Sequence, residues 1–168
     1  MKPDRVRIRE AFLDTTFLLP FFQIGVEVEA FALEDFKGFL ARLRRVHFSE
    51  LSVFEAKAKL RRLAGRDPAY ARALEAFGAN LAALREDERF VFHRYTAQDD
   101  GNFNLICSKG LGLDSFDAII LAQALSVGVL ITEDGEILAL RESGALAGDP
   151  ILGEVEIKRW KELGGGWG

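Results

Sequence analysis

Short apolar runs and amphipathic stretches alternate along this chain, which is the pattern of strands followed by helices. We expect a helix wherever apolar residues recur at intervals of three and four, as Phe36, Phe39 and Leu43 do. The expected strands are residues 11–13, 46–48, 89–95 and 129–131. The expected helices are residues 17–22, residues 33–45, a helix from Ser49 or Ser52 to Gly65, one from Pro68 past Leu84, and one that opens at residues 113–117 and closes at Gly128.

Strands that alternate with helices predict an α/β domain with a central, mostly parallel sheet and helices on both faces. With 168 residues, of which 49% are hydrophobic, the chain is long enough to bury one core and too short for two domains of ordinary size. We therefore expect a single domain over residues 1–163 and a flexible, glycine-rich tail at residues 164–168.

Charge and cysteine content exclude several classes of protein. The formal net charge is −4, which argues against coating a nucleic acid through overall positive charge, so any such contact must be local. One Cys and two His exclude an internal disulfide framework and a four-ligand zinc site. The N-terminal MKPDRVRIRE is too charged for a signal sequence, and the most apolar stretch is interrupted by Gln123, Ser126 and Gly128, so we expect a cytoplasmic protein without membrane contact.

Carboxylates occur where the expected strands end and the expected helices begin. Asp14 follows the first strand, Asp134 follows the strand at 129–131, and Glu55 and Asp117 lie in the first turns of apolar helices. Open α/β sheets hold ligands at the carboxyl ends of their strands, so these four candidate acids are expected to meet there. Clustered carboxylates repel one another unless a hard divalent cation such as Mg²⁺ or Mn²⁺ lies between them, which indicates metal-assisted hydrolysis of a phosphate ester.

Each candidate acid also has a purely structural interpretation. Asp14 and Asp134 would cap the helices that follow them. Ser52 and Glu55 have the spacing of a capping box, and Asp117 stands in the same relation to Asp114. The arrival of four acids together, two after strands and two at helix starts, favours a site over four separate caps.

Four segments of the sequence resemble the successive acidic motifs of the PIN (PilT N-terminus) domain family: FLDTTFLLPFF, ELSVFEAKAKL, SFDAIILAQAL and LITEDGEIL. The resemblance runs from Asp14 to about Leu138, and residues 66–112 match it less well. It implies a three-layer α/β/α nuclease fold, Mg²⁺ or Mn²⁺ at the acidic cluster, and cleavage of single-stranded or structured RNA. If the 3′ oxygen is the leaving group, as in related metal nucleases, the products carry a 5′ phosphate and a 3′ hydroxyl. Many small members resemble toxins of the VapC type.

Carried over residue by residue, the resemblance makes the candidate acids both metal ligands and catalytic residues: Asp14, Glu55 in preference to Glu50, Asp117 in preference to Asp114, and Asp134. It also implies that the hydroxyl groups of Thr16 and Thr132 support those ligands. No acid is missing, which favours an active enzyme. Whether one cation or two are used is left open.

The helix that carries Glu55 is predicted to bury Leu51, Phe54 and Ala58 on one face. Lys57 and Arg61 are four residues apart within a basic stretch, and we interpret them as contacts to substrate phosphates near Glu55. A solvated helix face without a role in binding explains these two residues equally well.

Two other classes of protein share parts of this pattern, but the sequence lacks residues that each of them needs. A phosphatase of the haloacid dehalogenase class needs an Asp two residues after the first, where Thr16 stands, and a receiver domain needs a lysine that ITED lacks. A PIN-like module that binds RNA in processing or ribosome maturation without turnover stays open. RNA is the expected partner, with an antitoxin protein added if the protein is a toxin, and a homodimer is left open.

Overall fold

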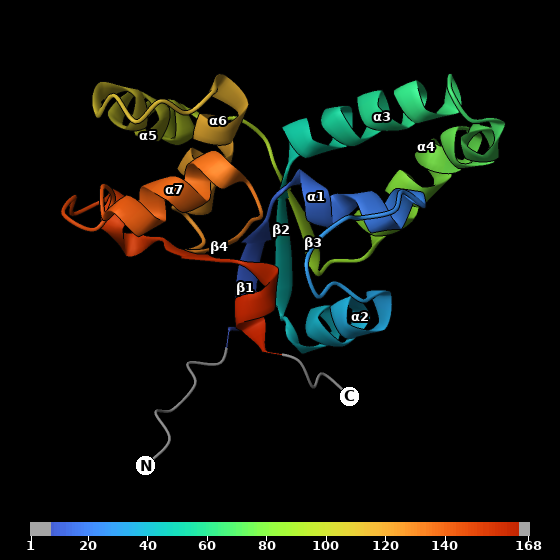
Figure 1. The fold of residues 1–168 in the computed structure, drawn as a ribbon, viewed down its shortest axis with the longest axis horizontal. Coiled ribbons are helices and arrows are strands. Elements are labelled where there is room, and N and C mark those ends of the chain that lie inside the picture. Colours follow the sequence, from blue (N-terminus) through green and yellow to red (C-terminus); the bar gives the residue numbers. More distant parts are fainter. Residues whose placement is uncertain (1–7, 165–168) are drawn as a thin grey trace, which may run out of the picture.

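The computed structural model describes residues 8–164 and shows a central parallel sheet between two layers of helices (Figure 1). The strand order is β3-β2-β1-β4-β5, and every neighbouring pair is parallel. This confirms the predicted three-layer α/β/α class. The strands are β1 Glu10–Leu13, β2 Arg45–Ser49, β3 Phe90–His93, β4 Val129–Ile131 and β5 Glu156–Lys158.

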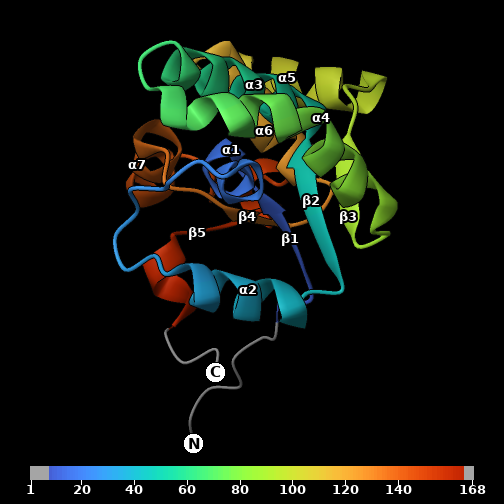
Figure 2. The same ribbon diagram turned by 90° about the vertical axis from the view of Figure 1, so that its right-hand side faces the viewer.

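Alternation along β1 divides the buried side chains between two cores. Ala11 and Leu13 belong to one core and Phe12 to the other, because successive strand residues point to opposite faces of the sheet. Helices α1 Thr15–Leu18, α2 Leu33–Arg42, α3 Glu50–Ala64 and α4 Ala71–Glu86 cover the first face, and α5 Ala97–Ser108, α6 Ser115–Ala124 and α7 Gly135–Ser143 cover the second (Figure 2).

Two expected helices are interrupted or shortened. The run at residues 17–22 is a turn of α1 followed by a 3₁₀ helix, Leu19–Phe22, because Pro20 has no N–H to continue the α-helical bonding. The helix expected at residues 33–45 ends at Arg42, since Leu43 is extended and Arg45 already pairs with Glu10 in the sheet. Pro68 begins a 3₁₀ turn, Pro68–Tyr70, that leads into α4.

The predicted buried face of α3 is wrong. Ser49 caps the helix by accepting from the backbone N–H of Leu51, and the residues that face the core are Ser52, Val53, Ala56 and Leu60. Phe54 is 66% exposed. The small side chains of Ser52 and Ala56 let α3 approach its neighbours, which a count of large apolar residues does not reveal. Ser52 lies inside the helix, so its interpretation as half of a capping box with Glu55 is also wrong.

Two elements carry too little apolar signal to be predicted. α5 begins with a capping box in which Thr96 and Asp99 satisfy each other's backbone N–H groups, but its first turns are polar and contain Gly101. β5 has only three residues. The predicted flexible tail falls largely on residues 165–168, outside the described residues. Within residues 8–164, no helix is long and apolar enough to cross a membrane.

Candidate active site

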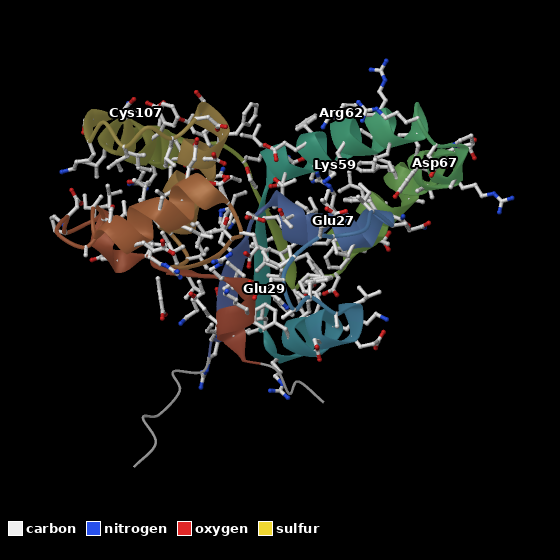
Figure 3. All side chains as sticks on the ribbon, in the orientation of Figure 1. Glu27, Glu29, Lys59, Arg62, Asp67 and Cys107 are labelled. Atoms are coloured by element: carbon white, nitrogen blue, oxygen red, sulfur yellow. The ribbon has the colours of Figure 1, made fainter. Side chains whose placement is uncertain are left out.

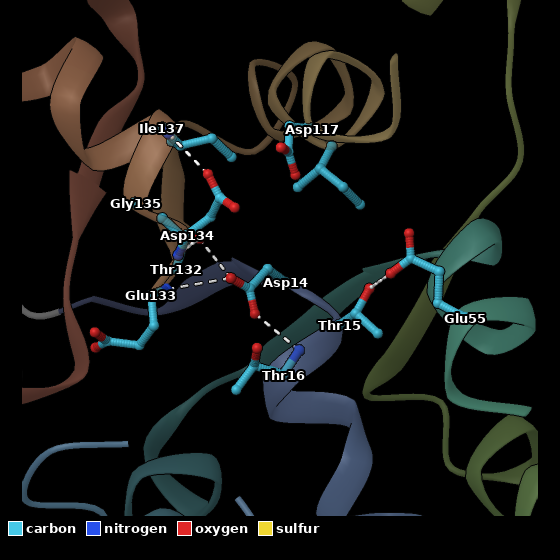
Figure 4. Close-up of a pocket in the computed structure, with 11 residues that line it drawn as sticks. Asp14, Thr15, Thr16, Glu55, Asp117, Thr132, Glu133, Asp134, Gly135 and Ile137 are labelled. Carbon is cyan, nitrogen blue, oxygen red and sulfur yellow. Dashed lines mark hydrogen bonds between the residues drawn. The ribbon is translucent and has the colours of Figure 1, made fainter. Parts of the chain in front are cut away.

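A polar pocket of about 340 Å³ opens where β1 and β4 end (Figure 4). In Figure 1, α3 lies on one side of these strand ends and α6 with α7 on the other. All four candidate acids line it, so the structure brings together what the sequence spreads over 121 positions, from 14 to 134. The lining residues are Asp14, Thr15, Thr16, Glu55, Asp117, Ile120, Thr132, Glu133, Asp134, Gly135 and Ile137.

Asp14 is held rigidly at the end of β1. Its Oδ1 accepts from the backbone N–H of Thr16 at 2.9 Å, and its Oδ2 accepts from the hydroxyl of Thr132 and from the backbone N–H of Glu133. Burial raises the pKa of Asp14 to about 6, against the opposing effect of these hydrogen bonds. Asp14 therefore caps α1 as expected and also presents a carboxyl group of fixed orientation to the pocket.

Thr132 connects Asp14 to Asp134. Its fully buried hydroxyl donates to Asp14 and accepts from the backbone N–H of Asp134 at 3.0 Å. Asp134 caps α7, because its Oδ1 accepts from the backbone N–H groups of Glu136 and Ile137. The second oxygen of Asp134 accepts no hydrogen bond from the described residues, which leaves it available to a ligand (Figure 4).

Asp117 is not a cap. Asp114 occupies that position and accepts from the backbone N–H of Asp117, so the carboxyl group of Asp117 is left without a hydrogen bond from the described residues. Burial, followed by the charges of nearby carboxylates of which Asp134 is the largest contributor, raises the pKa of Asp117 to about 7. Its negative charge is therefore poorly compensated by the protein.

Glu55 extends into the pocket from α3, and Thr15, which the sequence analysis did not predict as a site residue, orients it. The hydroxyl of Thr15 donates to Glu55 Oε2 at 2.5 Å, and the hydroxyl of Ser52 lies 2.9 Å from Thr15 Oγ1. The sequence position of Thr15, directly after Asp14 at the start of a helix, could have indicated this role. Thr16, the residue named instead, lines the pocket and contributes its backbone N–H to Asp14.

The two predicted substrate contacts lie outside the pocket lining. The ammonium group of Lys57 is 4.7 Å from the ring centre of Phe77 and 3.4 Å from the carbonyl oxygen of Leu74, which directs it toward α4. Arg61 is exposed farther along α3. A role in binding RNA stays a prediction for both residues.

The pocket contains five carboxylates and no lysine or arginine among its lining residues. Only Glu133 has basic compensation, from Arg159 at 3.3 Å, and its other oxygen accepts from the backbone N–H of Trp160. An all-oxygen, net negative donor set fits a hard divalent cation. Within residues 8–164, no three Asp, Glu, His or Cys side chains are already arranged as a metal site, so a cation would have to draw the free oxygens of Glu55, Asp117 and Asp134 toward the fixed carboxyl group of Asp14.

The chain matches the sequence model of a protein family over most of its length. The sequence model of the PIN domain matches residues 11–142, which include all four candidate acids and the stretch 66–112. No curated protein matches the chain. The match stops before β5, so the edge strand and the residues after it lie beyond the matched region.

Proposed function

This chain belongs to the PIN domain family, a nuclease-type family, and from that premise we propose that it is a metal-dependent endoribonuclease that hydrolyses RNA phosphodiester bonds. The observation that carries the proposal is the uncompensated negative charge of the pocket. Four carboxylates, from the end of β1, α3, α6 and the β4 to α7 turn, line one space, and none of them forms an ion pair with a Lys or Arg of residues 8–164. Binding a cation offsets their repulsion, which a purely structural set of caps would not require.

Asp14, Glu55, Asp117 and Asp134 would hold the cation, which is Mg²⁺ or Mn²⁺ in this proposal. When bound, such a cation lowers the pKa of a coordinated water and neutralises the charge that develops on the phosphate. The protein's own hydrogen bonds orient the carboxyl groups of Asp14 and Asp134. Thr132 and two backbone N–H groups fix Asp14, and α7 fixes one oxygen of Asp134 so that the other faces the pocket.

Glu55 has a separate part in this arrangement. Thr15 holds its Oε2, while Oε1 accepts no hydrogen bond from the described residues. In this proposal, that free oxygen would accept a hydrogen bond from the attacking water and orient it toward the phosphate. The family resemblance supports attack that leaves a 5′ phosphate and a 3′ hydroxyl.

Cleavage of a labelled single-stranded RNA tests the proposal. We expect internal cuts with Mn²⁺ or Mg²⁺, none after exhaustive treatment with EDTA, and none with Glu55→Gln. Glu50→Gln is the matched control, because Glu50 lies on the same helix, pairs with Arg85 and does not line the pocket. Cleavage that survives chelation would reject the metal mechanism. Binding of metal and RNA without any cleavage would favour the alternative, a PIN-like binding module in RNA processing.

The finer biological role is also part of the proposal. The resemblance supports a VapC-like toxin that acts in the cytoplasm, with an antitoxin protein as its partner and a single nuclease domain over residues 1–163. A gene for a small DNA-binding protein directly beside this one, whose product copurifies with the chain and inhibits cleavage, would support that role. Sedimentation of the purified chain would test the homodimer.

A further inference from the structure

Two exposed phenylalanines each directly precede a carboxylate that lines the pocket. Phe54 is 66% exposed and precedes Glu55, and Phe116 is 52% exposed and precedes Asp117. Single exposed apolar residues are common on protein surfaces. These two, however, stand near the starts of α3 and α6, the helices that flank the pocket on opposite sides (Figure 1).

Phe116 adjoins the pocket through its own helix. Ile120 lines the pocket one turn further along α6, and residues four apart lie on the same side of a helix. Asp117, the other lining residue of α6, is the next residue in the chain. Phe116 therefore lies on the same side of α6 as Ile120, which lines the pocket.

Phe54 is aligned with positive charge on the outer face of α3. Ala58 and Arg61 follow it at four and seven residues and are both exposed, so the small side chain of Ala58 separates a phenyl ring from a guanidinium group. Arg61 and Arg62 make no ion pair with a described residue. Figure 3 shows Lys59 and Arg62 on the same helix, clear of the sheet. Both acids of α3 are already engaged, Glu50 by Arg85 and Glu55 by Thr15.

An aromatic ring followed by an unpaired cation is the arrangement that binds a single-stranded nucleic acid, since bases stack on the ring and the backbone phosphate meets the charge. We propose that Phe54 and Phe116 stack nucleobases on the two sides of the phosphate at the pocket, and that Arg61 contacts a phosphate on the α3 side. This inference rests on the proposed function. Stacking of this kind requires unpaired bases at the two rings, because bases in a duplex do not offer free faces.

The charges along α3 favour RNA, rather than a partner protein, as the molecule that contacts Phe54 and Phe116. The path from Phe54 along α3 carries Lys59, Arg61 and Arg62 with no unpaired acid between them, which suits a polyanion. The pocket itself repels a polyanion unless a cation is bound, so contacts outside it must supply much of the affinity. Stacking of bases on Phe54 and Phe116 supplies such affinity without making RNA binding more dependent on salt concentration.

The test measures RNA binding without cleavage. Fluorescence anisotropy with a labelled single-stranded RNA in EDTA should show that Phe54→Leu and Phe116→Leu each weaken binding by about tenfold or more, the range for loss of one stacked base. Phe54→Tyr and Phe116→Tyr keep the ring and should bind as wild type does. Leu33→Ala, which trims a 49% exposed apolar residue of α2 on another part of the surface, should also leave binding unchanged. An RNA of the same length with abasic positions should bind wild type weakly. It should bind the leucine variants with the same affinity as wild type.

Two results would overturn the inference. One is unchanged affinity in both leucine variants. The other is a change from dimer to monomer in sedimentation, which would make the rings an interface between two copies of the chain. Melting temperatures near that of wild type show that the variants fold. Because binding is measured in EDTA, wild type that binds RNA but fails to cut it with Mn²⁺ rejects the proposed nuclease activity and leaves stacking intact.

Discussion

The carboxyl groups of Asp14 and Asp117 are both harder to ionise than a free Asp, for different reasons. Asp14 is buried, yet three donors fix its oxygens, so its pKa rises only to about 6. Asp117 has no donor and faces the charges of Asp134, Asp114, Glu136 and Glu55, and its pKa rises to about 7. Without a cation, the pocket therefore keeps a proton on each of the two groups up to a higher pH than in a free Asp.

This shift fixes the sign of a pH effect on stability. The pKa of Asp117 rises from 3.8 to about 7 on folding, so the folded protein binds more protons than the unfolded chain between those values. The free energy of unfolding therefore decreases as pH rises through this window, and it stays lowered above it.

We expect Asp117→Asn to abolish cleavage and to raise the melting temperature of the metal-free protein at pH 8, because the amide removes the repelled charge. The gain should fade as pH falls from 7 toward 3, because Asp117 is mostly protonated in both states only below 3.8. Mn²⁺ should raise the melting temperature of wild type more than that of the variant. Asp114→Asn is the control, since Asn caps a helix about as well as Asp and should leave cleavage intact. An active Asp117→Asn protein with the same response to Mn²⁺ as wild type would remove Asp117 from the site.

At the scale of single elements, the N-terminal ends of the helices position the acids. These helix ends were the part of the structure that the sequence predicted best. Asp14 and Asp134 act as the caps they were expected to be, and they line the pocket as well. The capping interpretation failed for Glu55, because α3 begins one turn earlier, at Ser49. Helix faces were harder to predict, since tertiary packing against small residues put Phe54 outside.

The double role of Asp134 can be separated by two substitutions. Asp134→Ala removes the acceptor for two backbone N–H groups of α7 and should lower the free energy of unfolding by about 1 kcal/mol, while it also abolishes cleavage. Asp134→Asn keeps the cap and should lose cleavage at nearly full stability. Urea denaturation beside the RNA assay separates these effects. Full activity in Asp134→Asn would mean that Asp134 serves only as a cap.

At the scale of the whole molecule, the parallel sheet is what gathers distant carboxylates at one edge, and the alternation of strands and helices was enough to predict it. The strand order and the edge strand β5 were not predictable, because β5 has three residues and its partner is set by tertiary contacts. Beyond the family match, the C-terminal segment joins the site to the first core: Trp160 donates its backbone N–H to Glu133, and its ring packs against Phe17 and Phe36.

We expect Trp160→Ala to destabilise the protein by about 3–5 kcal/mol, the usual cost of removing a large buried aromatic side chain. Trp160 is 4% exposed, contacts four phenylalanines and donates its ring N–H to the carbonyl oxygen of Ala30. Trp160→Phe keeps most of the packing and should cost less. Denaturation in urea measures both variants. A loss below about 1 kcal/mol in Trp160→Ala would show that the C-terminal segment is not part of the folded core.

The most direct test of the account is to locate Mn²⁺ in crystals of the protein by its anomalous scattering. We predict a peak in the pocket within coordination distance of carboxylate oxygens from Asp14, Asp117 and Asp134, with Glu55 bonded directly or through a water. The same experiment on Asp117→Asn should give a weaker peak or none. Crystals saturated with Mn²⁺ at pH 8 that show no anomalous peak among these four acids would contradict the assignment of this pocket as a metal-dependent nuclease site.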